Sequence, residues 1–124
     1  MWKIYSDKKA ETKGGYTTEK GGEERMKIWI DDLRVAPAGY VWCKSVNEAK
    51  ATIEKAERMG ETIEYLDLDH DAGDYQYDGG DFIKVLDWME ETGRAYACRI
   101  HTANPVGRQN MRMIVRKNGW EEIS

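Results

Sequence analysis

The chain has 124 residues, a formal net charge of −4 and two isolated cysteines, one in each half. That length is typical of one domain with one hydrophobic core, and cysteines without metal-ligand spacing argue against a disulfide scaffold and for a reducing compartment. No apolar run approaches the length of a membrane span and the first residues lack a signal-peptide core, so we expect a cytoplasmic protein without membrane contact. The acidic net charge and the lack of a long basic stripe argue against bulk nucleic-acid binding.

The first 25 residues are polar and contain two Gly-Gly pairs. Residues 11–18 predict a small β-hairpin with a two-residue turn. We therefore divide the chain into an N-terminal extension, residues 1–25, and a main domain, residues 26–124. The stretch before Met26 can be encoded by a purine-rich leader that resembles a ribosome-binding site, so Met26 is a candidate second start; a simple polar linker is the alternative.

The main domain alternates strand-like and helix-like segments. Strands are predicted at residues 27–32, 40–44, 62–69 and 95–101, and helices at about 46–59, 81–92 and 105–118. Ser45 followed by Glu48 forms a capping box for the first helix. This order predicts an α/β fold with a mainly parallel sheet, flanked by helices and joined by right-handed crossovers, in which a Pro-containing loop links the first two strands.

The only two histidines, His70 and His101, each close a strand-like stretch that a helix-like segment follows. Both should emerge at the carboxyl ends of strands, where open α/β sheets bind ligands. Taken singly, a strand-end histidine is more often a structural hydrogen-bonding group, but two at one edge favour acid-base catalysis or anion binding. We expect them to face one pocket; which is the acid and which the base stays open.

Charge is distributed unevenly along the chain. Residues 61–91 hold eleven Asp or Glu against one Lys, whereas residues 94–118 hold six Arg or Lys and no acid. Asp31, Asp32 and Asp69 follow two strands predicted to be neighbours, and like charges at that range cannot all ionise without a cation. Oxygen ligands favour Mg²⁺ or Mn²⁺. The alternative is that one Asp caps the following loop and the others are solvated.

The start of the last predicted helix is a candidate phosphate site. Asn104 is a good N-cap residue and Pro105 a good first residue, so free N–H groups should point beside His101 and attract phosphate. Arg108, in the first turn, could reach that phosphate. Arg34, two residues after the acid pair, is a second candidate for pairing with phosphate or carboxylate.

The acidic loop at residues 73–80 is long and glycine-rich enough to act as a lid. Tyr75 and Tyr77 within it are candidates for stacking on a base. The tryptophans are expected to line the core or its rim, although Trp42 could also stack on a base if it lies at the end of its strand.

Three motifs carry a resemblance to known families. Asp31-Asp32 after the first strand, Leu68-Asp69 after the third and Thr102-Ala103 after the fourth resemble a response-regulator receiver domain. In receivers the acids hold magnesium and the threonine contacts the phosphoryl group. A receiver also needs a lysine after a fifth strand, and nothing in this chain supplies it.

The chain is more similar to a derived family, the cyclic-phosphate processing receiver domain, over about residues 26–118. The matching motifs are Asp31-Asp32-Leu33-Arg34, Leu68-Asp69-His70-Asp71 and His101-Thr102-Ala103-Asn104-Pro105-Val106-Gly107 with Asn110-Met111. The resemblance implies a receiver-like (flavodoxin-like) fold and a phosphate site at the strand ends. By this resemblance Thr102 joins His70 and His101 at the reacting phosphate, and Asn110 is one of the ligand contacts. Because no base is paired with Thr102, we expect it to contact the ligand rather than to act as a nucleophile.

Three functions follow as alternatives. The first is a phosphoesterase that opens a cyclic phosphate, on an RNA end or a cyclic nucleotide signal, with two histidines and a metal. The second is a non-catalytic binder that sequesters a cyclic nucleotide signal, in the manner of a small phage protein used in counter-defence. The third is a phospho-accepting receiver that uses Asp69. The partner in the first two is a small phosphate-containing ligand; its base, its ring chemistry and the oligomeric state stay open.

Overall fold

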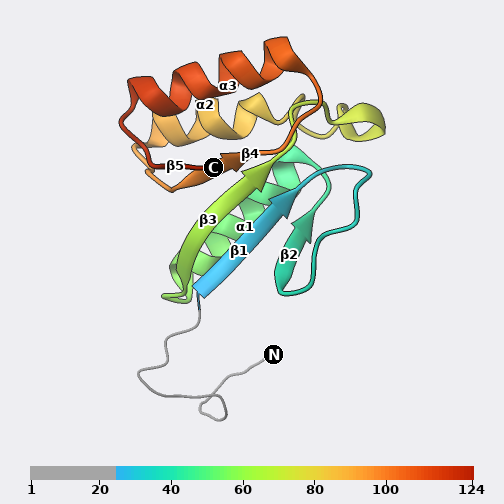
Figure 1. The fold of residues 1–124 in the computed structure, drawn as a ribbon. Helices are drawn as coiled ribbons and strands as arrows, with labels where there is room; N and C mark the ends of the chain where they lie inside the picture. Colours follow the sequence, from blue (N-terminus) through green and yellow to red (C-terminus); the bar gives the residue numbers. More distant parts are fainter. Residues whose placement is uncertain (1–24) are drawn as a thin grey trace.

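The computed structural model describes residues 25–124, and the hairpin predicted at residues 11–18 lies outside them. The elements, in chain order, are β1 (Arg25–Ile30), β2 (Tyr40–Cys43), α1 (Val46–Arg58), β3 (Thr62–Leu68), the short turn η2 (Gly73–Tyr75), α2 (Ile83–Thr92), β4 (Cys98–Ile100), α3 (Pro105–Lys117) and β5 (Glu122–Ile123) (Figure 1). None of these helices is both long and apolar enough to cross a membrane.

The strands form one sheet in the order β2-β1-β3-β4-β5, and every pair in it is parallel. This is the strand order of flavodoxin-like sheets. The receiver-like α/β fold expected from the sequence is therefore confirmed.

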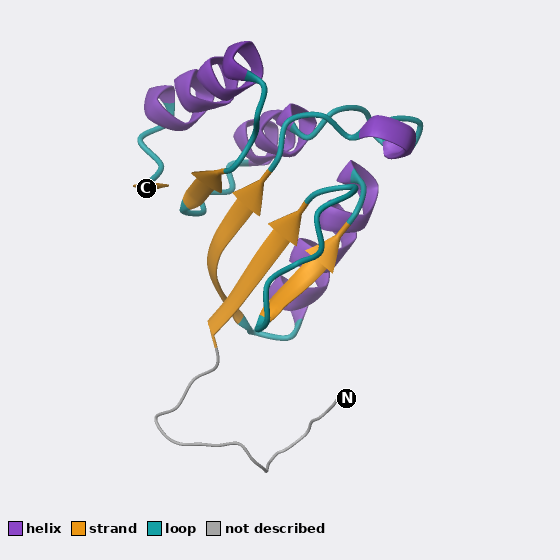
Figure 2. Cartoon of the chain, turned by 45° about the vertical axis from the view of Figure 1, so that its right-hand side comes forward, coloured by secondary structure: helices purple, strands orange, loops and turns teal. Residues whose placement is uncertain are grey.

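The helices cover only one face of the sheet. The β1–β2 connection runs one way across the sheet and all later connections run the other way, so right-handed crossovers put the first on the opposite face from the rest. The first crossover is the loop of residues 31–39, which passes in front of the sheet in Figure 2 while α1 lies behind it. The sequence predicted a loop, not a helix, between the first two strands, and the structure has a loop there. Among the described residues, that face of the sheet is therefore only thinly covered.

The core lies between the sheet and the three helices. Ile28 and Ile30 of β1 and Leu66 and Leu68 of β3 are fully buried in it, together with helix residues such as Met111. Each such side chain stabilises the fold by roughly 1.5–3 kcal/mol. Alternate residues of the same strands point to the opposite face.

Some element bounds differ from those predicted. β1 ends at Ile30 rather than at the acid pair, and β4 is confined to Cys98–Ile100. α2 begins at Ile83 rather than at Asp81, because the Asp81 carboxylate accepts the N–H of Ala72 at 3.0 Å and holds the preceding loop instead. β5 was not predicted, since two residues are too few to show an alternating pattern.

Candidate functional site

His101 lies directly after β4, and each nitrogen of its ring meets a carboxylate. Nδ1 is 2.6 Å from Oδ1 of Asp67, and Nε2 is 2.8 Å from Oδ2 of Asp31. The imidazole also stacks on the indole of Trp29, with ring centroids 3.9 Å apart and planes 7° from parallel. Each ring nitrogen is thus within hydrogen-bond distance of a carboxylate oxygen. Neither nitrogen is left free for a ligand.

Asp67 extends this cluster along the sheet. It lies between the buried Leu66 and Leu68 but points to the other face, where its Oδ2 accepts a hydrogen bond from Nη1 of Arg99 at 3.0 Å. The carboxylate is fully buried. A buried carboxylate needs compensation of this kind, which Arg99 and His101 supply together.

Asp31 caps the loop that follows β1. Its Oδ1 accepts the backbone N–H groups of Leu33 and Arg34, each at 2.9 Å. Burial alone would raise the pKa of Asp31, but the hydrogen bonds from Arg34, Leu33 and His101 outweigh burial and hold that pKa below its ordinary value. The capping alternative therefore holds for this one acid.

Three carboxylates, that of Asp31 among them, meet at the edge of the sheet. Asp31, Asp32 and Asp69 each offer an oxygen, and these oxygens lie within 4.8 Å of one another. Burial raises the pKa of Asp32, and the nearby carboxylates of Asp31, Asp69 and Asp74 raise it further. Within residues 25–124 no cationic side chain pairs with Asp32. An ionised Asp32 is thus uncompensated, and an all-oxygen donor set of this size fits Mg²⁺ or Mn²⁺.

Arg34 stands at the rim of this acidic cluster. Its Nη1 lies 3.3 Å from Oδ2 of Asp31 and 3.7 Å from Oδ2 of Asp69, and it donates to the carbonyl of His101 at 3.2 Å. The side chain is 50% exposed. It can therefore turn outward to a phosphate or carboxylate, for which a guanidinium is well suited.

His70 leaves the same edge on the other face of the sheet. Its ring packs against the first turn of α3, where a Cβ added to Gly107 would lie 2.5 Å from the His70 Cγ. Its Nδ1 lies 2.8 Å from Oδ1 of Asp71, and its backbone N–H donates to Asp69 at 2.8 Å. Among the described residues nothing hydrogen-bonds its Nε2. The two imidazoles therefore share an edge but not a face, and the expectation that they face one pocket is wrong. Leu68 pairs with Ile100, so His101 is level with Asp69, whereas His70 is one residue farther along and points to the opposite side.

The start of α3 is capped as predicted. The side chain of Asn104 accepts the N–H of Gly107 at 3.0 Å, and Pro105 opens the helix. Arg108 donates to the carbonyls of Thr102 and Ile100, so its guanidinium braces the end of β4. Thr102 is buried, and its Oγ1 accepts the N–H of Asn104 at 3.1 Å. Farther along α3, Asn110 is exposed.

The loop with the two tyrosines is held at several points. Asp78 accepts hydrogen bonds from Ser45 Oγ at 2.6 Å and from Asn47 Nδ2 at 3.1 Å. The rings of Tyr75 and Tyr77 are stacked with centroids 6.4 Å apart, and Tyr77 is 83% exposed. The structure thus presents an exposed ring on an anchored loop after β3.

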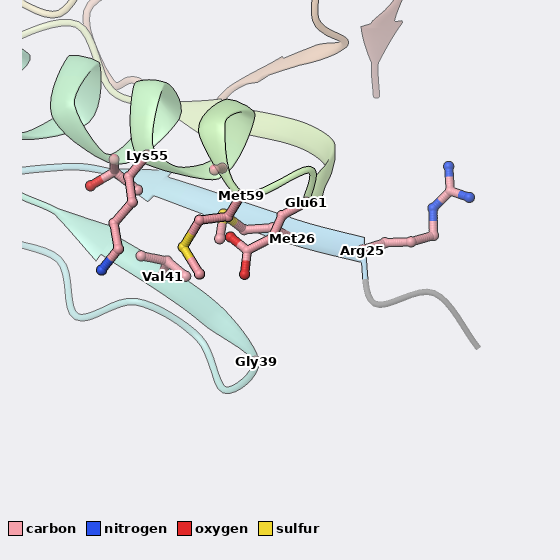
Figure 3. Close-up of a pocket in the computed structure, with 9 residues that line it drawn as sticks. Arg25, Met26, Gly39, Val41, Lys55, Met59 and Glu61 are labelled. Carbon is pink, nitrogen blue, oxygen red and sulfur yellow. The ribbon is translucent and has the colours of Figure 1, made fainter. Parts of the chain in front are cut away.

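A cavity of about 620 Å³ lies at the other end of the sheet (Figure 3). It is lined by the starts of β1 and β2 and the end of α1, with Met26, Val41 and Met59 among its lining side chains. Because the acidic cluster follows the carboxyl ends of the strands, this cavity is separate from it.

The sequence model of the cyclic-phosphate processing receiver domain matches residues 26–117. The chain belongs to this family. Searches among curated proteins and among solved structures found no match. In this receiver domain the acidic cluster lies between β1 and β3, where the crossovers diverge to opposite faces, which is the usual ligand site of open α/β sheets. Family and position together indicate a phosphate-containing ligand.

Sequence reasoning missed Trp29, Asp67 and Arg99 as site residues. An acid between two leucines in a central strand was the available signal. Such an acid must point to the face of the sheet opposite the buried leucines, where its carboxylate needs a hydrogen-bond partner. In the structure the partners are Arg99 of β4 and His101 directly after β4.

Proposed function

We propose that this receiver domain is a phosphoesterase that opens a cyclic phosphodiester. The observation that carries the proposal is the junction Asp69-His70. Asp69 belongs to the acidic cluster, and the next residue has an imidazole with one nitrogen unpartnered in the described structure. The two side chains leave the same edge of the sheet on opposite sides, so a phosphate that lies over this edge would contact both a cation site and a proton carrier.

Asp31, Asp32 and Asp69 would hold Mg²⁺ or Mn²⁺. When bound, the ion would neutralise charge that develops on the phosphate oxygens. Arg34 at the rim and the start of α3 then orient the phosphate through charge-assisted hydrogen bonds.

His70 carries the proton transfer. Its Nδ1 donates to Asp71, which leaves the lone pair of Nε2 as an acceptor. Nε2 takes a proton from the attacking water as the water oxygen bonds to phosphorus. The ring P–O ester bond breaks, and the proton returns to the leaving oxygen.

His101 acts as a positioning residue. Because both of its nitrogens are engaged, it orients Asp31 from the far side and does not contact the phosphate. Thr102 and Arg108 brace the end of β4 beside it. Tyr77, with Tyr75 behind it, stacks on the base of the ligand, and the exposed Asn110 lies on the helix that borders the site.

A second candidate is a binder that holds a cyclic nucleotide without cutting it. The engagement of His101 favours it, because the site then has one free imidazole instead of an acid-base pair. Such a site can still bind phosphate.

The test is a screen of 2′,3′-cyclic nucleotides, cyclic mononucleotides and cyclic dinucleotides, with and without Mg²⁺, for binding and for product. As an esterase the wild type forms product, and His70→Ala loses roughly 10²-fold in kcat with little change in affinity. The exposed Gln109→Ala serves as a control on the neighbouring helix. Binding without product assigns the second candidate, and neither binding nor product with any of these ligands overturns both. Labelling of Asp69 by acetyl phosphate would instead support the third alternative, a receiver that accepts a phosphoryl group on Asp69.

A further inference from the structure

The face of the sheet opposite the helices carries aromatic and cationic side chains. The register aligns Trp42, Trp29, Asp67 and Arg99 in one row across four strands. The next row toward the amino ends aligns Tyr40, Lys27 and Tyr65. We call these two rows, with Lys44 beside Trp42, the aromatic face; it is turned toward the viewer in Figure 1, with α1 behind it.

The rings on the aromatic face pack against one another at its centre. Tyr40 and Tyr65 have centroids 6.1 Å apart and hydroxyl oxygens 2.6 Å apart, and Tyr40 meets Trp29 edge-on at 5.7 Å. Tyr40, Tyr65 and Trp42 are each partly exposed. The hydrogen bond with Tyr65, together with burial, raises the pKa of Tyr40 to about 12, so the Tyr40 ring stays neutral. Neutral, partly exposed rings held in place are suited to stacking.

Cations border these rings. The Nζ of Lys27 lies 5.7 Å from the Tyr40 ring centroid and that of Lys44 lies 4.6 Å from the Trp42 ring centroid. The side chain of Arg99 is 41% exposed. The carboxylate of Asp67 in the same rows is fully buried between Arg99 and His101. In a chain of net charge −4, this face thus presents positive charge over aromatic rings.

The aromatic face is continuous with the acidic cluster. Its first row lies directly under His101, which stacks on Trp29. Lys27 precedes Asp31 by four residues on the same chain segment, a span of about 13 Å along a strand. The loop of residues 31–39 lies on this face over Trp29, whose Nε1 donates to the carbonyl of Arg34 at 2.8 Å. A chain of nucleotides that ends at the cluster therefore passes this loop before it reaches Tyr40 and Tyr65.

We propose that the aromatic face binds single-stranded RNA, namely the nucleotides that precede a terminal 2′,3′-cyclic phosphate held at the acidic cluster. The proposal rests on the proposed function for the position of that terminal phosphate. Bases stack on the partly exposed rings of Trp42, Tyr40 and Tyr65. Lys27, Lys44 and Arg99 pair with phosphates. Aromatic rings bordered by cations are the usual means of holding single strands without reading their sequence.

The test measures binding of the full chain to a mononucleotide, a trinucleotide and a pentanucleotide that end in a 2′,3′-cyclic phosphate, and to the pentanucleotide with a 3′-hydroxyl. Affinity should rise with length, by roughly tenfold for each stacked base. Tyr65→Ala and Lys27→Ala should remove most of that gain and leave mononucleotide binding unchanged. Lys50→Ala is the matched control, because its Nζ lies 5.9 Å from the Trp88 ring on the helical side. Tyr65→Phe keeps the ring and should keep the gain even if Tyr65→Ala fails to fold.

The outcomes separate this proposal from the proposed function. Affinity that does not depend on length, with the mononucleotide still bound, overturns RNA binding at the aromatic face and leaves the phosphoesterase intact. Equal affinity for the 3′-hydroxyl and cyclic-phosphate pentanucleotides, without any binding of the mononucleotide, supports the face and removes the phosphate site. A molar mass by light scattering that falls in Tyr65→Ala, without RNA binding in the wild type, assigns the face to a second copy of the chain and overturns the proposal.

Discussion

The Nε2 of His101 lies 2.8 Å from Oδ2 of Asp31, although 70 residues separate them in the chain. The contact spans the carboxyl end of β3, because β1 and β4 are not adjacent in the sheet. Asp67 of β3 holds the other nitrogen of the same ring. His101 therefore ties three strands together at the edge where the acidic cluster lies.

Replacing His101 by Ala should destabilise the fold more than replacing His70. The substitution leaves Asp31 and Asp67 as buried carboxylates that have lost a partner, which typically costs roughly 3–5 kcal/mol. That is a large share of the roughly 5–15 kcal/mol by which native domains are stable. Urea denaturation of both variants measures the difference. Equal losses in His101→Ala and His70→Ala would show that the ring of His101 does not stabilise the two carboxylates.

Gly107→Ala should displace His70 while leaving α3 helical. Alanine inside a helix is normally favoured over glycine by roughly 0.5–1 kcal/mol. At this position, however, the new Cβ would lie 2.5 Å from the Cγ of His70, so the ring must move away. We expect a shifted His70 resonance and loss of any His70-dependent turnover, with unchanged far-UV circular dichroism. Gln109→Ala on the same helix is the control; an unmoved His70 resonance in Gly107→Ala would refute the packing.

Local signals in the sequence predicted the elements that place the site. Ser45 accepts the N–H of Glu48 and Asn104 accepts that of Gly107, so the capping patterns located the starts of α1 and α3. The parallel order followed from the alternation of strands and helices. The meeting of Asp31, Asp32 and Asp69 followed in turn from the parallel order.

Contacts that depend on side-chain direction beyond the strand ends could not be predicted. The sequence placed both histidines at one edge, but it did not show that His101 would turn onto Trp29 and His70 under Gly107. The sequence led us to expect that the guanidinium of Arg108 faces a phosphate. In the structure it donates to the carbonyls of Ile100 and Thr102, and it must release them before it can bind a phosphate. Such choices are decided by packing across the sheet, which no local pattern encodes.

A chain that begins at Met26 should fold and bind its ligand like the full chain. β1 begins at Arg25, Met26 already pairs with Ile63 of β3, and the family match begins at residue 26. Truncation removes only one described residue of the sheet. Thermal unfolding and ligand titration of residues 26–124 beside the full chain check this. A large loss of Tm on truncation would show that the first 25 residues contribute to the folded domain.

Acid should weaken the ion pair between Arg94 and Glu57, which lies away from the acidic cluster. Arg94 donates to both carboxylate oxygens of Glu57 at 2.9 Å, and this hydrogen bond chiefly lowers the pKa of Glu57 below its ordinary value. A lowered pKa in the folded state stabilises the fold above the ordinary pKa, near 4.3, and the gain is lost as pH falls through the lowered value. For a partly exposed pair we expect a contribution of about 0.2–1 kcal/mol. Urea denaturation of Glu57→Gln should show that deficit at pH 7 and none in strong acid; a deficit that persists unchanged in strong acid would assign it to packing instead.

Asp32→Asn should stabilise the protein without divalent cations and abolish its stabilisation by Mg²⁺. Asp32 faces the carboxylates of Asp31, Asp69 and Asp74, which together with burial raise its pKa, so removing its charge relieves repulsion. A cation that binds only the folded wild type adds about 2.7 kcal/mol at a hundredfold excess over its Kd, and the variant lacks one of its three ligands. Thermal unfolding across a Mg²⁺ titration measures both effects. Asp74→Asn is the matched control, because it relieves the same repulsion from outside the cluster and should keep the Mg²⁺ response. A Tm that responds equally to Mg²⁺ in wild type, Asp32→Asn and Asp74→Asn would mean that the cluster does not hold the cation.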